Sequence, residues 1–249
     1  MSGTVVHIWR HPIKSHGREE LQSVTLSKGC TLPWDRAWAV LNTQARTDGK
    51  TWAQCSNFSR GAKAPLLMAI DAKLDEVENI VTLTHPDRAP LRFDPDTQTD
   101  QFLDWVAPLM PANRAASMRI VRVPGRGMTD TDFPSISLNN LASNRAVSQK
   151  LETNLSPLRW RGNIWFDGLA PWEEFDWVGK TLRIGSAEII VREPIRRCMA
   201  TTANPETGQR DADTLQTLQA NWGHENFGVY GEVIRSGEIK IGDMPQVLS

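Results

Sequence analysis

Apolar and polar residues alternate over short stretches of this chain, which is the pattern of half-buried β-strands. In the clearest stretch, every second residue from Met68 to Leu74 is apolar. The polar pair Glu78-Asn79 then predicts a turn into a second strand over residues 80–84. These two strands are expected to pair as a hairpin.

Similar apolar runs predict the other strands. They cover residues 5–10, the stretch that follows Arg36, and residues 119–123, 159–166, 181–184, 188–191, 228–234 and 238–241. Three turn signals predict hairpins, at Asp48-Gly49, Gly185-Ser186 and Ser236-Gly237. The first would return the chain into residues 50–53, and the other two would pair the strands that flank them.

Few helices are expected. Residues 99–110 carry apolar side chains at helical spacing and are followed by a proline. Ser137 is predicted to cap a second helix, and Asp213 a third. Many short strands, hairpin turns and few helices predict an α+β, mainly β fold with two β-barrel-like domains and a few peripheral helices. A connector over residues 113–117 predicts domains at 1–117 and 118–249.

The composition narrows the possible partners. The chain has 249 residues and a formal net charge of −1, which argues against a general nucleic-acid binder. The apolar runs are short and interrupted by charge, so no membrane association is expected. Cys30, Cys55 and Cys198 lie far apart and form neither a disulfide framework nor a metal finger. With no signal-peptide pattern at the N-terminus, these features predict a cytoplasmic protein.

One cysteine stands in a basic stretch. Cys198 follows an apolar strand and comes directly after Arg196 and Arg197. A thiol acts as a nucleophile or metal ligand in its thiolate form, and neighbouring cations lower its pKa. Cys198 would be such a thiolate if both arginines point towards its sulfur. The pattern also fits a small buried residue at the end of a strand.

Two N-terminal clusters could bind an anion. Lys14 and Ser15 follow the first predicted strand, where ammonium, hydroxyl and backbone N–H groups can hold a phosphate. A solvated polar loop is the alternative. Asp35 could fix the guanidinium of Arg36 for the same purpose, and a surface ion pair is the alternative there.

A third cluster lies in the second half of the chain. Arg161 and Asn163 are predicted on one face of the strand over residues 159–166. Two polar groups on an otherwise apolar strand need partners. A bound anion or an amide-bearing ring would serve, and so would an ordinary buried hydrogen-bond network.

The order of these motifs resembles the MOSC family, which includes the mitochondrial amidoxime-reducing component and related bacterial molybdoenzymes. The N-terminal half is similar to the MOSC N-terminal β-barrel domain through His-Pro-Ile-Lys-Ser at 11–15 and Asp-Arg-x-Trp at 35–38. The second half is similar to the MOSC domain through Arg161-Gly162-Asn163, Trp177-x-Gly179, Arg197-Cys198-x-x-Thr201-Thr202, Pro205-Glu206-Thr207-Gly208, Leu215-x-x-Leu218, Phe227-Gly228-Val229-Tyr230 and Ile241-Gly242-Asp243. The similarity covers nearly the whole chain.

The resemblance implies a molybdenum–molybdopterin cofactor at the junction of two domains. Cys198 would be the catalytic residue and the protein's sulfur ligand to the metal. The residues that would hold the cofactor are Lys14, Ser15, Arg36, Ser137, Arg161, Asn163, Arg197 and Thr201. Loss of Lys14 or Arg36 is expected to lower cofactor occupancy without greatly lowering stability. The resemblance also implies pyridoxal phosphate binding, a property attributed to the family.

By the same resemblance, the protein would be an oxidoreductase that reduces small N-hydroxylated or N-oxide-type substrates. Three cysteines cannot ligate a four-cysteine iron–sulfur cluster, and no Gly-x-Gly-x-x-Gly motif follows a predicted strand. Electrons are therefore expected from a separate protein of the ferredoxin, cytochrome b5 or flavin reductase type. Two alternatives stay open: a sulfur carrier with a persulfide on Cys198, and a non-catalytic protein that stores the cofactor. Arg196 stands where many relatives have serine or threonine, which bears on substrate access.

Overall fold

The computed structural model describes residues 3–248 and contains fifteen strands and three α-helices in that range. The strands are β1 (Thr4–Arg10), β2 (Glu19–Leu21), β3 (Ser23–Leu26), β4 (Trp38–Asn42), β5 (Asp71–Asp75), β6 (Ile80–His85), β7 (Arg88–Phe93), β8 (Ser117–Arg122), β9 (Ile136–Asn140), β10 (Ile164–Asp167), β11 (Thr181–Ile184), β12 (Ala187–Arg196), β13 (Asn226–Arg235), β14 (Gly237–Lys240) and β15 (Gln246–Leu248). The predicted mainly β fold is confirmed.

The helices are short and lie outside the sheets. The α-helices are α1 (Thr99–Val106), α2 (Leu141–Leu151) and α3 (Thr214–Trp222). The 3₁₀-helices are η1 (Cys55–Asn57), η2 (Pro65–Ala69), η3 (Ala107–Leu109), η4 (Pro157–Trp160), η5 (Glu173–Trp177) and η6 (Met199–Thr202). None of the helices in the described range combines the length and apolarity that a membrane crossing requires.

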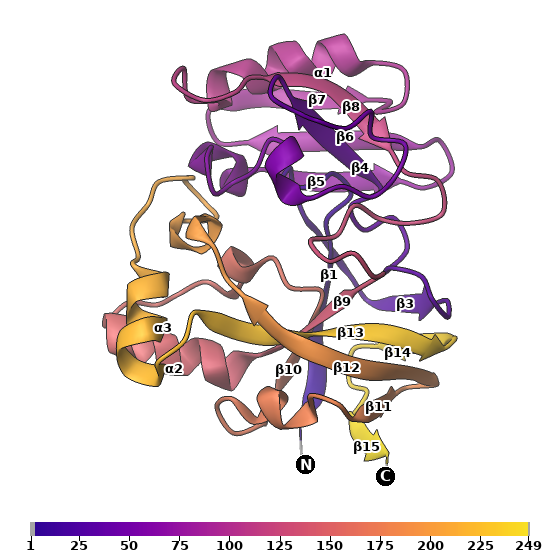
Figure 1. Cartoon of the computed structure of the whole chain (residues 1–249), viewed down its shortest axis with the longest axis vertical. Helices are drawn as coiled ribbons and strands as arrows, with labels where there is room; N and C mark the ends of the chain where they lie inside the picture. The colour runs from indigo at the N-terminus through magenta and orange to yellow at the C-terminus, as the bar shows by residue number, and fades with distance from the viewer. Residues whose placement is uncertain (1–2, 249) are drawn as a thin grey trace.

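The largest sheet contains eight strands in the order β15-β11-β12-β13-β9-β10-β1-β2. Neighbouring strands run antiparallel, except that β9 and β10 are parallel. Figure 1 shows this sheet curling, with β12 and β13 as its long strands. Branched apolar side chains such as Ile8, Ile164 and Val229 fill its core and are completely buried.

The other sheets are smaller. Strands β5, β6 and β7 form an antiparallel sheet, and β4 pairs with β8. These elements and α1 lie at the opposite end of the molecule from α2, α3 and β15 (Figure 1). Their core is formed around the aromatic side chains of Trp38, Phe93 and Phe102.

The N-terminal segment links the two ends. Strands β1 and β2 are the last two strands of the eight-stranded sheet, and β3 pairs with β14 near the C-terminus. Residues 4–26 therefore pack with the second half of the chain. The segments that follow β1 can thus contribute side chains to the junction of the two halves. The predicted boundary at residue 117 stays a prediction.

Two hairpins are as predicted and two are not. Strands β5 and β6 pair, and β11 pairs with β12 across Gly185-Ser186. The turn at Asp48-Gly49 does not produce a hairpin, because β4 pairs with β8 and residues 50–53 form no strand. The predicted hairpin at Ser236-Gly237 does not form either. Strand β13 lies between β12 and β9 and has no free edge, so β14 pairs with β3 instead.

Three local predictions also need correction. Ser137 lies within β9, and the helix begins later, at an N-cap formed by Asn140, whose Oδ1 accepts a hydrogen bond from the N–H of Ala142. The predicted strand over 159–166 begins only at Ile164, because η4 precedes it. The alternating pattern after Met68 becomes strand only from Asp71, since η2 occupies residues 65–69 and begins with a proline.

Burial of one carboxyl group should make the stability of the protein depend on pH. Glu174 is completely buried in η5, and its Oε2 accepts hydrogen bonds of 2.9 Å from Asn140 Nδ2 and from Ser143 Oγ. Burial raises the pKa of Glu174 from 4.5 to about 7. The native state therefore binds this proton more tightly than the unfolded state, so stability is greatest below pH 4.5 and falls as the pH rises towards 7.

We predict that Glu174→Gln removes this dependence. Glutamine keeps the acceptor and cannot ionise, so the free energy of unfolding of the wild type should fall by about 3 kcal/mol relative to the variant between pH 4.5 and 7.5. Urea denaturation of both proteins across this range measures the difference. A difference that stays constant with pH would contradict the assignment.

Candidate functional site

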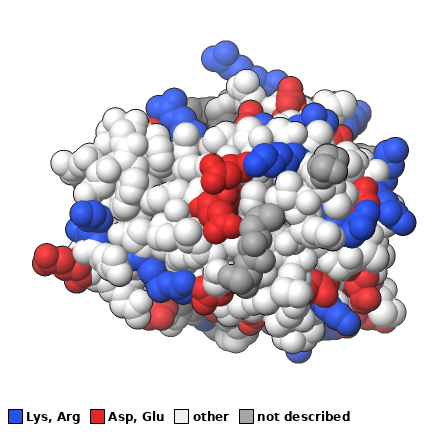
Figure 2. Space-filling view, turned by 90° about the horizontal axis from the view of Figure 1, so that it is seen from below, with Lys and Arg blue, Asp and Glu red and all other residues white. Residues whose placement is uncertain are grey.

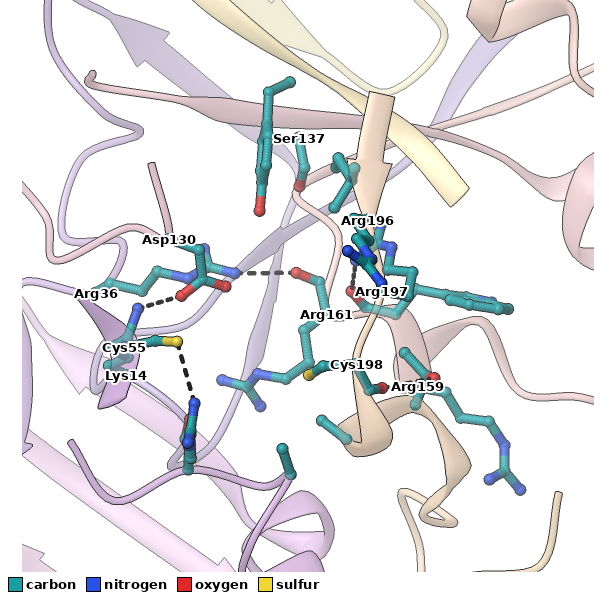
Figure 3. Close-up of a pocket in the computed structure, with 18 residues that line it drawn as sticks. Lys14, Arg36, Cys55, Asp130, Ser137, Arg159, Arg161, Arg196, Arg197 and Cys198 are labelled. Carbon is teal, nitrogen blue, oxygen red and sulfur yellow. Dashed lines mark hydrogen bonds and ion pairs between the residues drawn. The ribbon is translucent and has the colours of Figure 1, made fainter. Parts of the chain in front are cut away.

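A pocket opens at the junction between the N-terminal elements and the eight-stranded sheet (Figure 3). Its empty volume, including the part open to solvent, is about 840 Å³. From the first half of the chain it is lined by Lys14, Ser15, Arg36, Cys55, Arg60 and Ala62. From the second half it is lined by Asp130, Ser137, Arg159, Trp160, Arg161, Ile195, Arg196, Arg197, Cys198, Ala200, Thr201 and Tyr230. Side chains from distant parts of the sequence thus meet in one place.

The pocket brings together nearly all of the residues that the sequence singled out. Those on its walls are Lys14, Ser15, Arg36, Ser137, Arg161, Arg197, Cys198 and Thr201. Asn163 is absent from the wall and lines a smaller cavity with Ser137, Arg36 and Asp130. This convergence places the residues, while their binding of a cofactor stays a prediction.

Three residues on the walls have an unusual backbone conformation. Ser15, Arg36 and Arg161 have φ values of 65°, 54° and 49°. Side-chain-bearing residues rarely adopt this left-handed region, and such strained residues cluster at functional sites. For Arg161, the conformation follows directly from the end of η4, where its N–H donates to the carbonyl oxygen of Leu158 at 3.2 Å.

Lys14 is held by the loop that precedes β9. Its Nζ donates to the carbonyl oxygen of Met128 at 2.8 Å and forms an ion pair with Asp130. The surrounding protein would raise the pKa of Asp130, but Lys14 and Arg36 outweigh this effect and lower it to about 2. Asp130 is therefore a carboxylate at neutral pH, and it lies among the basic residues of the pocket (Figure 3).

Arg36 is held by a buried acid. Its Nη1 forms an ion pair with Asp35, whose side chain is completely buried, and its Nη2 donates to the carbonyl oxygen of Arg161 at 3.1 Å. The backbone N–H of His11 donates to Asp35 Oδ1 at 2.8 Å. Burial alone would raise the pKa of Asp35, but Arg36 and the hydrogen bonds from His11 lower it well below its usual range. The predicted pairing of Asp35 with Arg36 is confirmed, although the pair is buried.

Arg161 points into the pocket, between Cys55 and Cys198 (Figure 3). Its Nη2 donates to the carbonyl oxygen of Gly17 at 3.1 Å. Its Nη1 is buried and has no hydrogen-bond acceptor among the described residues. Burial lowers the pKa of Arg161 to about 9, with a further contribution from Arg36. Arg161 does not share a strand face with Asn163, and that prediction was wrong.

Arg197 is anchored by the protein itself. Its Nε, Nη1 and Nη2 donate to the carbonyl oxygens of Phe227 at 2.8 Å and Trp160 at 2.7 Å and to Asn139 Oδ1 at 3.0 Å. Asn139 can approach Arg197 because the residues that lie against its side chain, Gly162 and Gly228, have no Cβ. A Cβ at Gly162 would lie only 2.1 Å from Asn139 Nδ2. Arg197 therefore fixes the backbone that leads to Cys198.

The remaining predicted residues also hold the walls in place. Ser137 Oγ donates to Asn163 Oδ1 at 3.0 Å and accepts from the N–H of Asn163 at 2.8 Å. Asn163 Nδ2 donates to the carbonyl oxygen of Trp9 at 3.1 Å, which links β1 to the residue that precedes β10. Thr201 and Thr214 share a hydrogen bond of 2.6 Å between their hydroxyls, which ties η6 to α3. These contacts favour the buried-network interpretation for Asn163.

Cys198 lies at the start of η6 and is exposed to the pocket. The condition for a lowered pKa, that both arginines point towards the sulfur, is not met. Surrounding protein atoms raise the pKa of this thiol, and the opposing effect of Arg197 is smaller. Arg196 points instead to Glu225, with which it forms an ion pair of 3.1 Å, and its side chain is 82% exposed. The Cys198 thiol is therefore protonated at neutral pH.

The pocket has a strongly basic lining. Among the described residues it gathers seven cationic side chains and one carboxylate, namely Lys14, Arg36, Arg60, Arg159, Arg161, Arg196 and Arg197 with Asp130. On the face shown in Figure 2, by contrast, basic and acidic side chains are interspersed among uncharged residues. Although the net charge of the chain is −1, positive charge is concentrated in this pocket, which favours an anionic ligand.

Several pocket residues were not predicted from the sequence. Tyr230 is the protein's single tyrosine and stands in one of the quoted motifs, which was the available signal. Burial raises its pKa well above the usual range. Asp130 lies in a polar loop with no distinguishing pattern. Cys55 and Arg60 come from a segment that was predicted to follow a hairpin, and only the fold brings them to the pocket.

Family models match both halves of the chain. The MOSC N-terminal beta barrel domain matches residues 2–113, and the MOSC domain matches residues 129–245.

Curated relatives match part of the chain. A protein named molybdenum cofactor sulfurase 2 from Culex quinquefasciatus is 36% identical over 81 residues, which cover 32% of this chain and 10% of that protein. Molybdenum cofactor sulfurase from Drosophila grimshawi is 30% identical over 140 residues, which cover 53% of this chain and 18% of that protein. The protein of the same name from Anopheles gambiae is 29% identical over 150 residues, which cover 51% of this chain and 19% of that protein. The matches thus span less than a fifth of each of these relatives.

Two similar solved structures are more distant. YuaD from Bacillus subtilis is 11% identical, with a TM-score of 0.47, over 99% of this chain and 96% of that chain. YiiM from Geobacillus stearothermophilus is 18% identical, with a TM-score of 0.37, over 46% and 54%.

Proposed function

Because this chain is a MOSC-domain protein, we propose that its pocket binds a molybdenum–molybdopterin cofactor and reduces small N-hydroxylated or N-oxide-type molecules. The observation that carries the proposal is the convergence of an exposed thiol, Cys198, and seven basic side chains on one pocket. Relatives named molybdenum cofactor sulfurase support the link to this cofactor.

The residues of the pocket fit an anionic pterin phosphate. Arg161 Nη1 is a buried donor without an acceptor among the described residues, and an unsatisfied buried donor is costly. A phosphate oxygen would satisfy it. Lys14, Ser15 and Arg36 line the same pocket and would supply further ammonium, hydroxyl and guanidinium donors. In this proposal the N-terminal turns hold the phosphate.

Cys198 would supply the one sulfur that the protein contributes to the metal. No group of three His, Cys, Asp or Glu side chains within residues 3–248 could hold a metal ion unaided. A cofactor that brings its own dithiolene sulfurs suits this donor set, since a soft metal accepts a single thiolate from the protein. Ligation requires loss of the Sγ proton, whose pKa is raised here, so binding would release that proton.

When bound, such a cofactor supplies two-electron oxygen-atom-transfer chemistry. Overall, the N–OH group, two electrons and two protons yield N–H and water. The protein's own contribution would be positioning. Arg197 holds the Cys198 backbone through contacts to Phe227 and Trp160, and Arg36 is held by Asp35. Rigid supports of this kind keep a ligand and a substrate in one geometry.

Pyridoxal phosphate is not part of the proposal. Its chemistry needs a lysine amine free to form a Schiff base. Lys14, the lysine on the pocket wall, is engaged with Met128 and Asp130.

We predict that the protein needs a separate electron donor. With a reduced viologen as artificial donor, the purified protein should convert an aryl amidoxime to the amidine, as followed by viologen absorbance and product chromatography. With NADH alone it should be inert until a ferredoxin, cytochrome b5 or flavin reductase is added, because the chain has no dinucleotide motif and too few cysteines for a four-cysteine cluster. Metal-depleted protein is the control. Steady turnover with NADH and this chain alone would contradict the prediction.

A sulfur carrier is the second candidate. It is favoured by the names of the relatives and by the exposure of the Cys198 thiol, which would hold a persulfide. Metal and pterin analysis of the purified protein separates the candidates. About one molybdenum and one pterin per chain with viologen-driven turnover would support the reductase, and the same content without turnover would indicate a store. Metal-free protein with labile sulfur on Cys198 would indicate the carrier.

A further inference from the structure

Arg60 is a pocket cation that the proposed cofactor site does not use. It lies between η1 and η2, is partly buried, and donates from Nη1 to Cys55 Sγ at 3.2 Å, which is one of the dashed contacts in Figure 3. No carboxylate of residues 3–248 lies within ion-pair distance of it. Its charge is therefore not neutralised within the described part of the protein.

The other cations of the pocket are accounted for. Ion pairs join Lys14 to Asp130, Arg36 to Asp35, Arg159 to Asp211 and Arg196 to Glu225. Arg197 donates to three protein oxygens, and Arg161 is assigned to the cofactor in the proposed function. Arg60 thus remains as the cation that needs an anionic partner.

The loop that carries Arg60 lies against the segment that begins at Cys198. Arg210 donates from Nη2 to the carbonyl oxygen of Ala62 at 2.9 Å and also contacts Thr202 in η6. A Cβ at Gly61 would lie 3.6 Å from the Cβ of Ala200. Arg210 therefore links Ala62 to η6, and the distance at Gly61 shows that the neighbouring backbone lies close to Ala200. A ligand at Arg60 would lie in the same pocket as the Cys198 sulfur.

We propose that Arg60 binds a carboxylate group of the substrate, so that the pocket selects N-hydroxylated molecules that carry a negative charge. This inference rests on the proposed function and names its substrate class. An arginine presents planar N–H donors that match a carboxylate in a bidentate pair. Partial burial strengthens such a pair relative to one in water. Asp130, the carboxylate on the pocket wall, is paired with Lys14 and does not compete for Arg60.

The test compares two probes, an aryl amidoxime and the same amidoxime with a para-carboxylate. Calorimetric titration should show that the wild type binds the carboxylate probe about tenfold more tightly than the neutral probe. One charge-assisted hydrogen bond lowers a dissociation constant by about this factor. Arg60→Gln should reduce this ratio to about one, and Arg60→Lys should retain part of it. Lys63→Gln is the matched control, because it removes one exposed charge from the same loop outside the pocket wall.

Each outcome decides the inference. Equal binding of both probes by the wild type, or an unchanged ratio in Arg60→Gln, would overturn it. Loss of the ratio in Lys63→Gln as well would reduce the effect to general surface charge and overturn it too. Viologen-driven reduction of the same probes tests the proposed function separately. If neither probe is reduced, the reductase proposal fails, while the ratio of dissociation constants still decides the role of Arg60.

Discussion

Replacing Cys198 with serine is expected to abolish the reduction of N-hydroxylated substrates while leaving the fold intact. The side chain is exposed to the pocket, so the change removes no core packing. Serine is nearly isosteric, but its hydroxyl stays protonated near neutral pH and is a poor ligand for a soft metal. Loss of a group that merely supports a metal ligand costs about 10- to 100-fold, so loss of the ligand itself should cost at least about 100-fold.

Three measurements make this result specific. Viologen-driven turnover, molybdenum content and thermal unfolding are compared for the wild type, Cys198→Ser and Cys30→Ser. Cys30 is the matched control because it lies outside the pocket wall. We expect turnover to fall in Cys198→Ser alone, with an unchanged unfolding temperature. Full activity in that variant at normal molybdenum content would exclude Cys198 as a required ligand.

Replacing Arg36 with alanine should destabilise the protein as well as weaken cofactor binding. The sequence predicts a loss of occupancy alone, but the structure shows that Asp35, the ion-pair partner of Arg36, is completely buried. Removing one partner of a buried pair leaves an uncompensated charge, which costs about 3–5 kcal/mol. Urea denaturation at pH 7 should show a decrease of this size in the free energy of unfolding, and pterin content should fall at least about tenfold.

Two further variants separate the effects on stability and binding. The double variant Asp35→Asn/Arg36→Gln removes both charges, so it should recover most of the stability and still purify with low pterin content. Lys14→Ala should lower pterin content without a large loss of stability, because its partner Asp130 is 56% exposed and water can solvate the carboxylate. Wild-type stability and full pterin content in Arg36→Ala would refute both roles of Arg36.

The motifs led to the pocket because each of them ends or interrupts a regular element. Lys14 and Ser15 follow β1, Arg36 precedes β4, and Cys198 follows β12. Residues at such positions are free to project into a junction. Ser137 and Thr201 also line the pocket, although they lie within β9 and η6. Asn163 was predicted within a strand, but it precedes β10 and lines the smaller cavity with Ser137, Arg36 and Asp130. Its side chain is used to hold β1 and β9 together instead.

Electrostatics at the site could not be predicted from adjacent residues. Arg196 and Arg197 both neighbour Cys198, yet one pairs with Glu225 on the surface and the other is held by Phe227 and Trp160. The sign of the shift in the pKa of Cys198 depends on how many protein atoms surround the sulfur, and only the folded chain provides them. The sequence places both arginines beside Cys198, but only the folded structure shows that Arg196 points away and that burial outweighs Arg197.

Local sequence by itself determined the mainly β character, the pairing of β5 with β6 and of β11 with β12, and the capping of α3 by Asp213. Each of these depends on residues close together in the chain, where side-chain periodicity and turn chemistry act directly. Tertiary structure decided the rest. Strand β13 had both edges occupied, so β14 paired with β3, and Cys55, Arg60 and Ala62 came to line the same pocket as Cys198. Distant segments compete for the same strand edges and the same buried space. Which segment pairs depends on the whole fold, so a local sequence pattern does not predict it.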